Sequence, residues 1–409
     1  MQYQIKAPAS ICGRVVLPAS KSISNRALVI NALSGNQRLP ENVSDCDDTK
    51  VMLRWLETKP EVVDIGAAGT AMRFSTALLT VTEGTRCITG TERMKNRPIA
   101  VLVDALRQLG ADIEYMEKEG FPPLRILGNP LLAGGELSLP GNVSSQYISA
   151  LLLIAPVLKK GLRLVLTDTV ISRPYIDMTM AIMRDFGAKV RWTAEQAIEV
   201  EPGGYQQRPY YVESDWSAAS YWYEIMALQQ GPTAEVVLPG LFAKSLQGDS
   251  RGAQLFEQLG VQTAFEGNEV RLRKSTNRVE HLEYNFVEMP DLAQTFVVTC
   301  CMLGIPFHFT GLQSLRIKET DRIHALEVEL AKLGFVLKDR NDSELLWAGE
   351  RKDVAKEVAI DTYEDHRMAM AFAPVSLCGK EIRINNPEVV TKSYPNYWKD
   401  LKSVGFTIG

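Results

Sequence analysis

The residues of this chain that are best suited to chemistry are cations and hydroxyls placed where helices should begin. Segment 18–26 contains Lys21, Arg26 and three serines, and an apolar helical pattern follows it over 27–33. A helix N-terminus presents unpaired N–H groups and a positive dipole end, which suit a phosphate or a carboxylate. Arg26 can hold such an anion by two parallel hydrogen bonds. The segment predicts an anion-binding helix start; the alternative is a hydroxyl-capped surface helix with solvated cations.

Three further segments combine small, hydroxyl or amide residues with cations or helix starts. Segment 66–73 joins two glycines and a threonine to an arginine, segment 91–98 contains three cations, and segment 141–147 has consecutive serines before an apolar run. Glycine permits close backbone approach to an anion, and hydroxyls at a helix start can bind one. The alternatives are tight helix packing, a solvated loop and ordinary helix capping, respectively.

Carboxylates stand beside cations in the second half of the chain. Asp291 precedes a buried helical pattern, and Glu319 lies between Lys318 and Arg322 in a dense charged segment. As an N-cap, Asp291 needs no further function, but a carboxylate in a cationic pocket can donate or accept a proton. Lys318 and Arg322 share a helix face if the helix starts early. Two later segments add the cations Arg367 and Lys392.

The elements that position these residues repeat along the chain. An amphipathic helix, a glycine and a strand recur at intervals of roughly 75 residues, which indicates repeated structural units. The glycines suit the left-handed residue that ends a helix, and they are Gly110, Gly187, Gly260, Gly334 and Gly405. A cation precedes the helix in four units, at Arg97, Arg173, Arg322 and Lys392. Cations oppose the dipole of a helix N-terminus, and a bound anion would resolve that conflict.

The repeat also predicts the domain organisation. A helix over 51–57 belongs to a sixth unit that lacks the glycine and whose strands are shortened. Segment 205–215 is the best candidate for a crossover, so that the six units divide three and three. We expect one domain over 18–214 and a second formed by 1–17 and 215–409.

Composition excludes several classes of protein. The net charge is −4 and the isoelectric point is about 5.8, which argues against a nucleic-acid-binding stripe and for a focused small-anion site. The six cysteines show no CxxC spacing and indicate reduced thiols in the cytoplasm. The N-terminus lacks the apolar core of a signal peptide, and the longest apolar stretch, 296–309, is too short to span a bilayer. With neither metal-ligand spacing nor a dinucleotide or P-loop motif, we expect no metal and no cofactor.

Four motifs, collinear over essentially the whole chain, resemble those of the 5-enolpyruvylshikimate-3-phosphate synthase family. They are Leu17-Pro18-x-Ser20-Lys21-Ser22-x-Ser24-Asn25-Arg26-Ala27, Gly69-Thr70-Ala71-Met72-Arg73, Arg316-x-Lys318-Glu319-x-Asp321-Arg322 and Asp365-His366-Arg367-Met368-Ala369. The resemblance implies two inverse α/β domains, each of three βαβαββ units, with helix N-termini facing a central cleft. That architecture agrees with the sixfold repeat.

The resemblance also implies an activity. The family transfers the enolpyruvyl group of phosphoenolpyruvate to the 5-hydroxyl of shikimate 3-phosphate and releases phosphate, a step of chorismate and aromatic amino acid biosynthesis in the shikimate pathway. The implied partners are these two small molecules only, with no nucleic acid and no membrane, and the implied state is a cytoplasmic monomer.

Residue roles follow from the same resemblance. Asp291 and Glu319 would be the proton-transfer carboxylates, assisted by Lys21, and Tyr175 would line the cleft. The residues expected to bind phosphoenolpyruvate are Lys21, Gly69, Arg97, Gln146, Arg322, Arg367 and Lys392. The residues expected to bind shikimate 3-phosphate are Lys21, Ser22, Arg26, Ser144, Ser145, Gln146, Ser172, Asp291, Ser314 and Lys318.

The chain departs from the family pattern at three positions. Ala67 and Ser314 stand where the family usually has asparagine, and Phe74 stands where it usually has proline. None of these changes removes a charged group. Because Ala67 and Phe74 flank the Gly69 turn, we expect weaker inhibition by glyphosate, the family's phosphoenolpyruvate-site inhibitor.

Two rival functions remain open from the sequence. The first is the related enolpyruvyl transferase that acts on UDP-N-acetylglucosamine, whose family carries a cysteine in a mobile loop. The corresponding segment here, 90–98, has no cysteine, and Cys87 falls in an earlier apolar strand. The second is a catalytically weak or non-catalytic relative that binds shikimate 3-phosphate without releasing phosphate.

Overall fold

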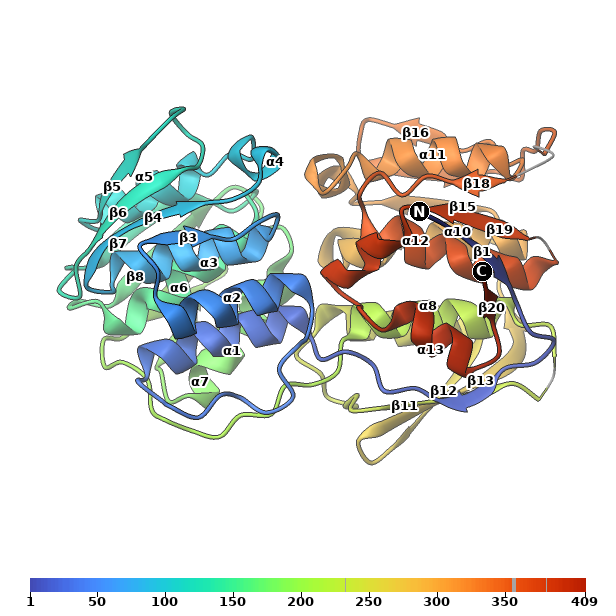
Figure 1. Cartoon of the computed structure of the whole chain (residues 1–409), viewed down its shortest axis with the longest axis horizontal. Coiled ribbons are helices and arrows are strands. Elements are labelled where there is room, and N and C mark those ends of the chain that lie inside the picture. Colours follow the sequence, from blue (N-terminus) through green and yellow to red (C-terminus); the bar gives the residue numbers. More distant parts are fainter. Residues whose placement is uncertain (232, 355–357, 380) are drawn as a thin grey trace. The chain divides into compact units, whose positions relative to one another are not determined.

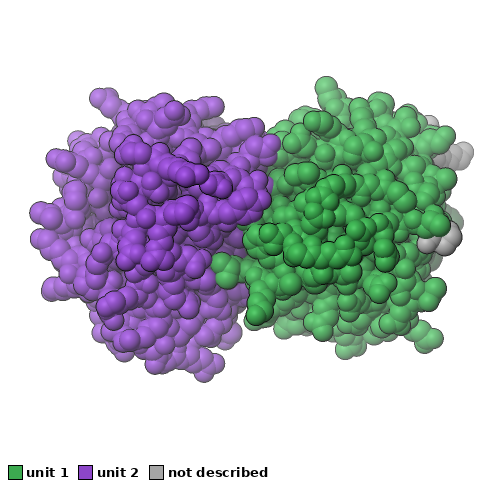
Figure 2. Space-filling model, turned by 90° about the horizontal axis from the view of Figure 1, so that it is seen from below, with its two compact units in different colours: residues 1–18, 213–409 green, residues 19–212 purple. Residues whose placement is uncertain are grey.

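The protein consists of two compact units, each with its own hydrophobic core. A computed structural model describes residues 1–231, 233–354, 358–379 and 381–409. Unit 1 comprises Met1–Pro18 and Glu213–Gly409, and unit 2 comprises Ala19–Val212 (Figure 2). The boundaries differ by one or two residues from those expected from the repeat. That each unit is a separately folding domain stays a prediction.

A βαβαββ unit is clearest in the second half of unit 2, where one four-stranded sheet has the order β7-β8-β10-β9. Its elements are β7 (Gly135–Pro140), α6 (Ser145–Ile154), β8 (Leu162–Thr167), α7 (Arg173–Asp185), β9 (Val190–Ala194) and β10 (Ala197–Val200). The first two strands run parallel, with Leu137 opposite Leu164, because a helix connects them. The last two strands form an antiparallel hairpin.

The preceding unit repeats this plan, with a sheet in the order β3-β4-β6-β5. Its elements are β3 (Val62–Asp64), α3 (Gly69–Thr80), β4 (Gly84–Thr89), the short α4 (Glu92–Lys95), α5 (Ala100–Gln108), β5 (Asp112–Tyr115) and β6 (Leu124–Gly128). The first unit retains only α1 (Lys21–Leu33) and α2 (Asp47–Thr58), and the described residues give it no sheet of its own. Helix α1 instead packs against α3, α6 and α7. This explains why the sequence pattern is shortened there.

Unit 1 contains three βαβαββ units, with sheets in the orders β12-β13-β11-β2, β14-β15-β17-β16 and β18-β19-β1-β20. The first is built from β2 (Cys12–Arg14), α8 (Trp216–Leu228), β11 (Glu235–Pro239), α9 (Gly252–Glu257), β12 (Leu259–Glu266) and β13 (Glu269–Arg278). The second is built from β14 (Leu282–Asn285), α10 (Ala293–Leu303), β15 (Phe307–Thr310), α11 (Arg322–Lys332), β16 (Lys338–Arg340) and β17 (Glu344–Trp347). The third is built from β18 (Ala359–Ile360), α12 (His366–Phe372), β19 (Ile382–Asn385), α13 (Tyr397–Ser403) and β20 (Thr407–Ile408), completed by β1 (Gln2–Lys6).

The N-terminal segment is part of unit 1. Strand β1 pairs antiparallel with β19 and β20, and β2 pairs parallel with β11. The sheet of the third unit therefore closes with residues from the opposite end of the chain.

The helix ends confirm the glycine pattern in four units; in the remaining one, Gly260 lies in β12, after α9 has ended at Glu257. The repeat glycines Gly110, Gly187, Gly260, Gly334 and Gly405 all have φ between 85° and 102°. In the unit without this glycine, Lys59 takes the left-handed conformation after α2, with φ 45° and ψ 51°.

The helices of the interior are buried on nearly all faces. In unit 1, α8, α10 and α12 lie side by side (Figure 1), and their residues are mostly apolar or small. In unit 2, every residue of α3 is buried. These helices hold the polar residues at their N-terminal ends in fixed positions. No helix among the described residues is long and apolar enough to cross a membrane.

Candidate active site

The centre of the polar cluster in unit 1 is Arg322, the first residue of α11, whose side chain is 2% exposed. Its Nε lies 2.7 Å from an Asp365 oxygen, its Nη2 lies 2.9 Å from Glu319 Oε2, and its Nη1 lies 3.2 Å from Asp291 Oδ1. A single buried guanidinium therefore joins three carboxylates from three segments. Such a multiply bonded ion pair fixes geometry more than it adds stability.

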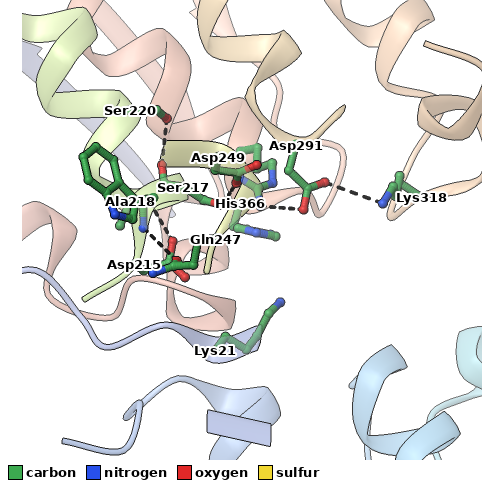
Figure 3. A network of polar contacts seen from close by, with 12 residues as sticks. Lys21, Asp215, Ser217, Ala218, Ser220, Gln247, Asp249, Asp291, Lys318 and His366 are labelled. Carbon is green, nitrogen blue, oxygen red and sulfur yellow. Dashed lines mark hydrogen bonds and ion pairs between the residues drawn. The ribbon is translucent and has the colours of Figure 1, made fainter. Parts of the chain in front are cut away.

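Three more cations surround the same carboxylates. Arg367 Nη2 lies 3.0 Å from Asp291 Oδ2, and Lys318 Nζ lies 3.5 Å from Asp291 Oδ1. Figure 3 shows the Asp291 carboxylate turned toward Lys318. Lys392 Nζ lies 2.8 Å from Glu319 Oε1. The two carboxylates predicted to transfer protons are thus each held between cations predicted to bind substrate anions.

This arrangement sets the protonation of Asp291 and Glu319. Burial alone would raise the pKa of Asp291, but the charges of Arg367, Lys318 and Arg322 outweigh it and lower the pKa well below its usual value. Burial likewise acts to raise the pKa of Glu319, and Arg322 and Lys392 lower it well below its usual value. Both groups are ionised at neutral pH while these pairs persist.

Local structure places each residue of the cluster, with two corrections to the sequence interpretation. Asp291 does not cap α10: it lies in a 3₁₀ turn, Pro290–Leu292, and α10 has no side-chain cap. Lys318 does not share a helix face with Arg322, because α11 begins only at Arg322 and Lys318 has a non-helical ψ of −146°. The side chains of Lys318 and Arg322 nevertheless both contact Asp291, because a turn rather than a helix brings Lys318 there.

A third correction concerns Lys392. It was expected at a helix N-terminus, but it ends the 3₁₀ helix Pro387–Lys392, and α13 begins later, at Tyr397. Arg322, by contrast, does begin a helix, with Asp321 accepting a hydrogen bond from His324 N at 3.1 Å. At Arg322, three carboxylates of the protein compensate the positive charge that the helix dipole disfavours.

In unit 2, α1 begins at Lys21, as the motif predicted. Ser20 Oγ accepts a hydrogen bond from Ile23 N at 3.5 Å, and Lys21 pairs with Asp48 at 3.5 Å. Ser22 follows in the first turn, and its carbonyl accepts a hydrogen bond from Arg26.

Arg26 is buried, and burial lowers its pKa to about 10. Its Nε donates to Thr179 Oγ1 at 2.7 Å and its Nη2 to Ser149 Oγ at 3.2 Å, and it also donates to the backbone oxygens of Ser22 and Tyr175. The guanidinium therefore joins α1 to α6 and α7. Binding of an anion by two parallel hydrogen bonds from Arg26 stays a prediction. It requires Arg26 to give up some of its hydrogen bonds to the protein.

The starts of α3 and α6 meet in the same unit. Gln146 Nε2 donates to Thr70 Oγ1 at 3.1 Å. Gly69 packs closely against the Arg97 guanidinium, since a Cβ on Gly69 would come within 2.6 Å of Arg97 Nη1. The buried Arg73 donates to the carbonyls of Gly69, at 3.1 Å, and Pro98, at 3.3 Å. Arg73 therefore fixes the glycine turn against the segment that carries Arg97.

The remaining predicted residues have ordinary local roles. Ser144 caps α6 by accepting a hydrogen bond from Gln146 N at 3.4 Å, and Ser145 is the first residue of that helix. Ser172 precedes α7 with φ 53° and makes no side-chain cap. Tyr175 is half-buried near the start of α7, and the half-buried Ser314 lies in the 3₁₀ helix Gln313–Ile317.

Two of the departures from the family pattern lie in different environments. Ala67 is exposed in the turn before α3. Phe74 is fully buried inside α3, and its ring centroid lies 5.3 Å from Arg26 Cζ. Phe74 therefore packs against Arg26, and an effect of Phe74 on the Gly69 turn stays a prediction.

The sequence interpretation assigned no function to Asp365, Asp48 or Asp249. Asp365 caps α12 by accepting a hydrogen bond from Arg367 N at 2.9 Å, so its position before a buried helix was the available signal. Among the described residues, no group of three histidines, cysteines or carboxylates could hold a metal ion.

The fold and these two clusters define a class of protein: an α/β protein of repeated βαβαββ units, with cations and carboxylates clustered in unit 1 and polar helix starts in unit 2. A family model for EPSP synthase (3-phosphoshikimate 1-carboxyvinyltransferase) matches residues 5–59 and 56–401. The chain belongs to the EPSP synthase family, and it is therefore an enzyme of the transferase class.

Individual relatives agree along the whole chain. A 3-phosphoshikimate 1-carboxyvinyltransferase of Bacteroides fragilis is 59% identical over 408 residues, which cover 100% of this chain and 99% of the relative. The enzymes of the same name from Sulfurovum sp. and Vibrio cholerae are 35% and 37% identical, and each alignment covers at least 95% of both chains. A solved EPSP synthase structure from Acinetobacter baumannii has a TM-score of 0.79 at 21% identity, covering 100% of this chain and 99% of that one, which shows the shared fold.

Proposed function

We propose that this chain transfers the enolpyruvyl group of phosphoenolpyruvate to the 5-hydroxyl of shikimate 3-phosphate and releases inorganic phosphate. The observation that carries the proposal is the pair of half-buried carboxylates, Asp291 and Glu319, each held among cations of unit 1. Family membership supports the assignment of the substrates.

The reaction needs acid and base in an anionic environment. Protonation at C3 of phosphoenolpyruvate makes C2 electrophilic, and the 5-hydroxyl then forms a C–O bond to C2 while losing its own proton. The bond between C2 and the bridging oxygen then breaks, and that oxygen leaves with the phosphate. Loss of a proton from C3 restores the double bond. Asp291 and Glu319 are the carboxylates for these proton transfers, with Lys21 assisting.

The ion pairs of unit 1 give the carboxylates a way to become active. Arg322, Arg367 and Lys392 are assigned to phosphoenolpyruvate, and the same three cations contact Asp291 and Glu319. An incoming anion that pairs with these cations compensates the positive charge that lowers the pKa of Glu319. Its pKa then rises toward the range in which a carboxyl can deliver a proton near neutral pH.

The binding residues are assigned by family resemblance and by the local geometry of each unit. The proposed phosphoenolpyruvate set is Lys21, Gly69, Arg97, Gln146, Arg322, Arg367 and Lys392. The proposed shikimate 3-phosphate set is Lys21, Ser22, Arg26, Ser144, Ser145, Gln146, Ser172, Asp291, Ser314 and Lys318. Both sets draw on both units, so substitutions in either unit should reduce turnover. We further propose that the enzyme acts as a cytoplasmic monomer.

Continuous measurement of phosphate release tests the proposal. Purified protein should release phosphate when given both substrates and should release none when shikimate 3-phosphate is replaced by UDP-N-acetylglucosamine. Binding of shikimate 3-phosphate without phosphate release would favour the non-catalytic relative. Release with the UDP-sugar would favour the related transferase.

A further inference from the structure

A buried carboxyl that the proposed mechanism does not use lies beside this cluster. Asp249 belongs to the 3₁₀ helix Gly248–Arg251 of unit 1 and is 5% exposed. Its Oδ2 accepts a hydrogen bond from Ser217 Oγ, and its Oδ1 has no hydrogen-bond partner among the described residues. A buried ionised carboxylate with a single hydrogen bond is costly. Protonation of the carboxyl removes most of that cost.

Asp249 and Asp291 occupy opposite environments within one network. Asp291 contacts Arg322, Lys318 and Arg367, whereas Asp249 contacts a hydroxyl. Burial, followed by the negative charge of Asp291, raises the pKa of Asp249 to about 7. Two carboxyls whose pKa values are driven apart in this way commonly have different roles in an active site.

Ser217 links Asp249 to the substrate-binding cations. Ser217 Oγ lies 3.5 Å from Arg367 Nη2, and the same Nη2 lies 3.0 Å from Asp291 Oδ2. Figure 3 shows Ser217 and Asp249 close together, with Asp291 beyond them. A change in the charge of Asp249 should therefore alter the interactions of Arg367, because the Ser217 hydroxyl contacts both side chains.

We propose that Asp249 is a positioning residue of the transfer reaction: in its protonated form it accepts a hydrogen bond from Ser217, and it leaves the charge of Arg367 to Asp291 and to the anion that Arg367 binds. This inference rests on the proposed function for its consequence in catalysis. Ionised Asp249 would draw Arg367 toward Ser217 and would repel Asp291 and the incoming phosphoenolpyruvate.

The charged groups around Asp249 favour its neutral form. Asp215, the N-cap of α8, and Asp291 are both acidic neighbours that raise its pKa, and Arg367 on α12 is the cation that opposes them. On its own element, Arg251 forms an ion pair with Glu288. Burial, together with these charges, keeps about half of Asp249 protonated at about pH 7.

The variant Asp249→Asn tests the role, because asparagine has the shape of the neutral acid and does not titrate. For a pKa near 7, the protonated fraction of Asp249 falls about twentyfold between about pH 6.5 and about pH 8.5. The ratio of kcat/KM for phosphoenolpyruvate, variant over wild type, should therefore rise by up to about twentyfold over this interval. Using the ratio cancels the titration of the substrates. The matched control Asp112→Asn, at an exposed position of β5 in unit 2, should give a ratio that does not change with pH.

A second measurement needs no substrate and separates this inference from the proposed function. Carbon-13 NMR of protein labelled at the aspartate carboxyl groups should show a resonance that titrates at about pH 7 and is missing from Asp249→Asn. Titration of that resonance below about pH 5 would overturn the inference even if the enzyme is fully active. A pH-independent activity ratio for Asp249→Asn would overturn it as well. Absence of turnover in the wild type would instead refute the proposed function and leave the NMR result to decide the role of Asp249.

Discussion

Replacing Asp365 by asparagine removes one negative charge from the buried cluster while keeping nearly the same shape. Asp365 is fully buried, and its two oxygens lie 2.7 Å from Arg322 Nε and 3.4 Å from Arg322 Nη2. It also accepts the hydrogen bond that caps α12. Asparagine is an equally good N-cap, so the substitution isolates the loss of the charge.

The structure indicates the size of the effect. Removing one partner of a buried ion pair costs about 3–5 kcal/mol, because the other charge is left uncompensated. Arg322 keeps Glu319 and Asp291 as partners, so we expect the lower end of this range, about 3 kcal/mol. For a unit of this size, that loss corresponds to a fall of about 6–12 °C in the midpoint of thermal unfolding.

Urea unfolding followed by tryptophan fluorescence measures the change, and unit 1 carries its own reporters in Trp216, Trp222, Trp347 and Trp398. The matched control is Asp342→Asn, whose side chain is 85% exposed and lies 3.0 Å from Arg316. That pair should contribute less than about 1 kcal/mol. A free energy of unfolding for Asp365→Asn within about 1 kcal/mol of wild type, or equal to that of the control, would refute the reasoning.

Three further predictions follow from single residues. Glu319→Gln should retain binding of both substrates and lose about 10²–10⁴-fold in kcat, because the amide removes the titratable proton; near-normal turnover would exclude Glu319 from proton transfer. Ala67→Asn should lower the inhibition constant of glyphosate more than the KM for phosphoenolpyruvate, since a hydrogen bond to a charged group contributes about 1.5–3 kcal/mol; equal changes in the two constants would contradict this. Burial raises the pKa of Glu224 well above its usual 4.5, so the folded state loses stability as pH rises above that value. Glu224→Gln should therefore stabilise the protein by about 1.4 kcal/mol for each pH unit from about 4.5 up to the folded pKa, and a gain that is the same at every pH in urea unfolding would contradict the assignment.

Local features of the chain were predictable from the sequence because they depend on neighbouring residues. The positive φ of Gly110, Gly187, Gly334 and Gly405 follows from the helix that each one ends. The helix starts at Lys21 and Ser145 follow from hydroxyl capping before an apolar run. The recurrence of helix, glycine and strand was read from the period of the repeat, whereas the βαβαββ plan was implied by the family resemblance.

Contacts between distant segments were not predictable in this way. Asp291 had the local pattern of an N-cap, and only the folded unit brings it to Arg322, Lys318 and Arg367. Lys318 appeared to need a helix to lie near Arg322, whereas the two cations meet at a shared carboxylate. Asp249 carried no motif, because its role depends on Ser217, which is far from it in the sequence.

Product analysis in a single reaction tests the central claim most directly. Wild-type protein is mixed with shikimate 3-phosphate and phosphoenolpyruvate labelled with carbon-13 at C2, and carbon and phosphorus NMR spectra are recorded together. We predict a new enol ether carbon, coupled through oxygen to the 5-position of the shikimate ring, that appears in equal amount with inorganic phosphate. Phosphate without the enol ether, or an unchanged C2 resonance in the presence of bound shikimate 3-phosphate, would contradict the account.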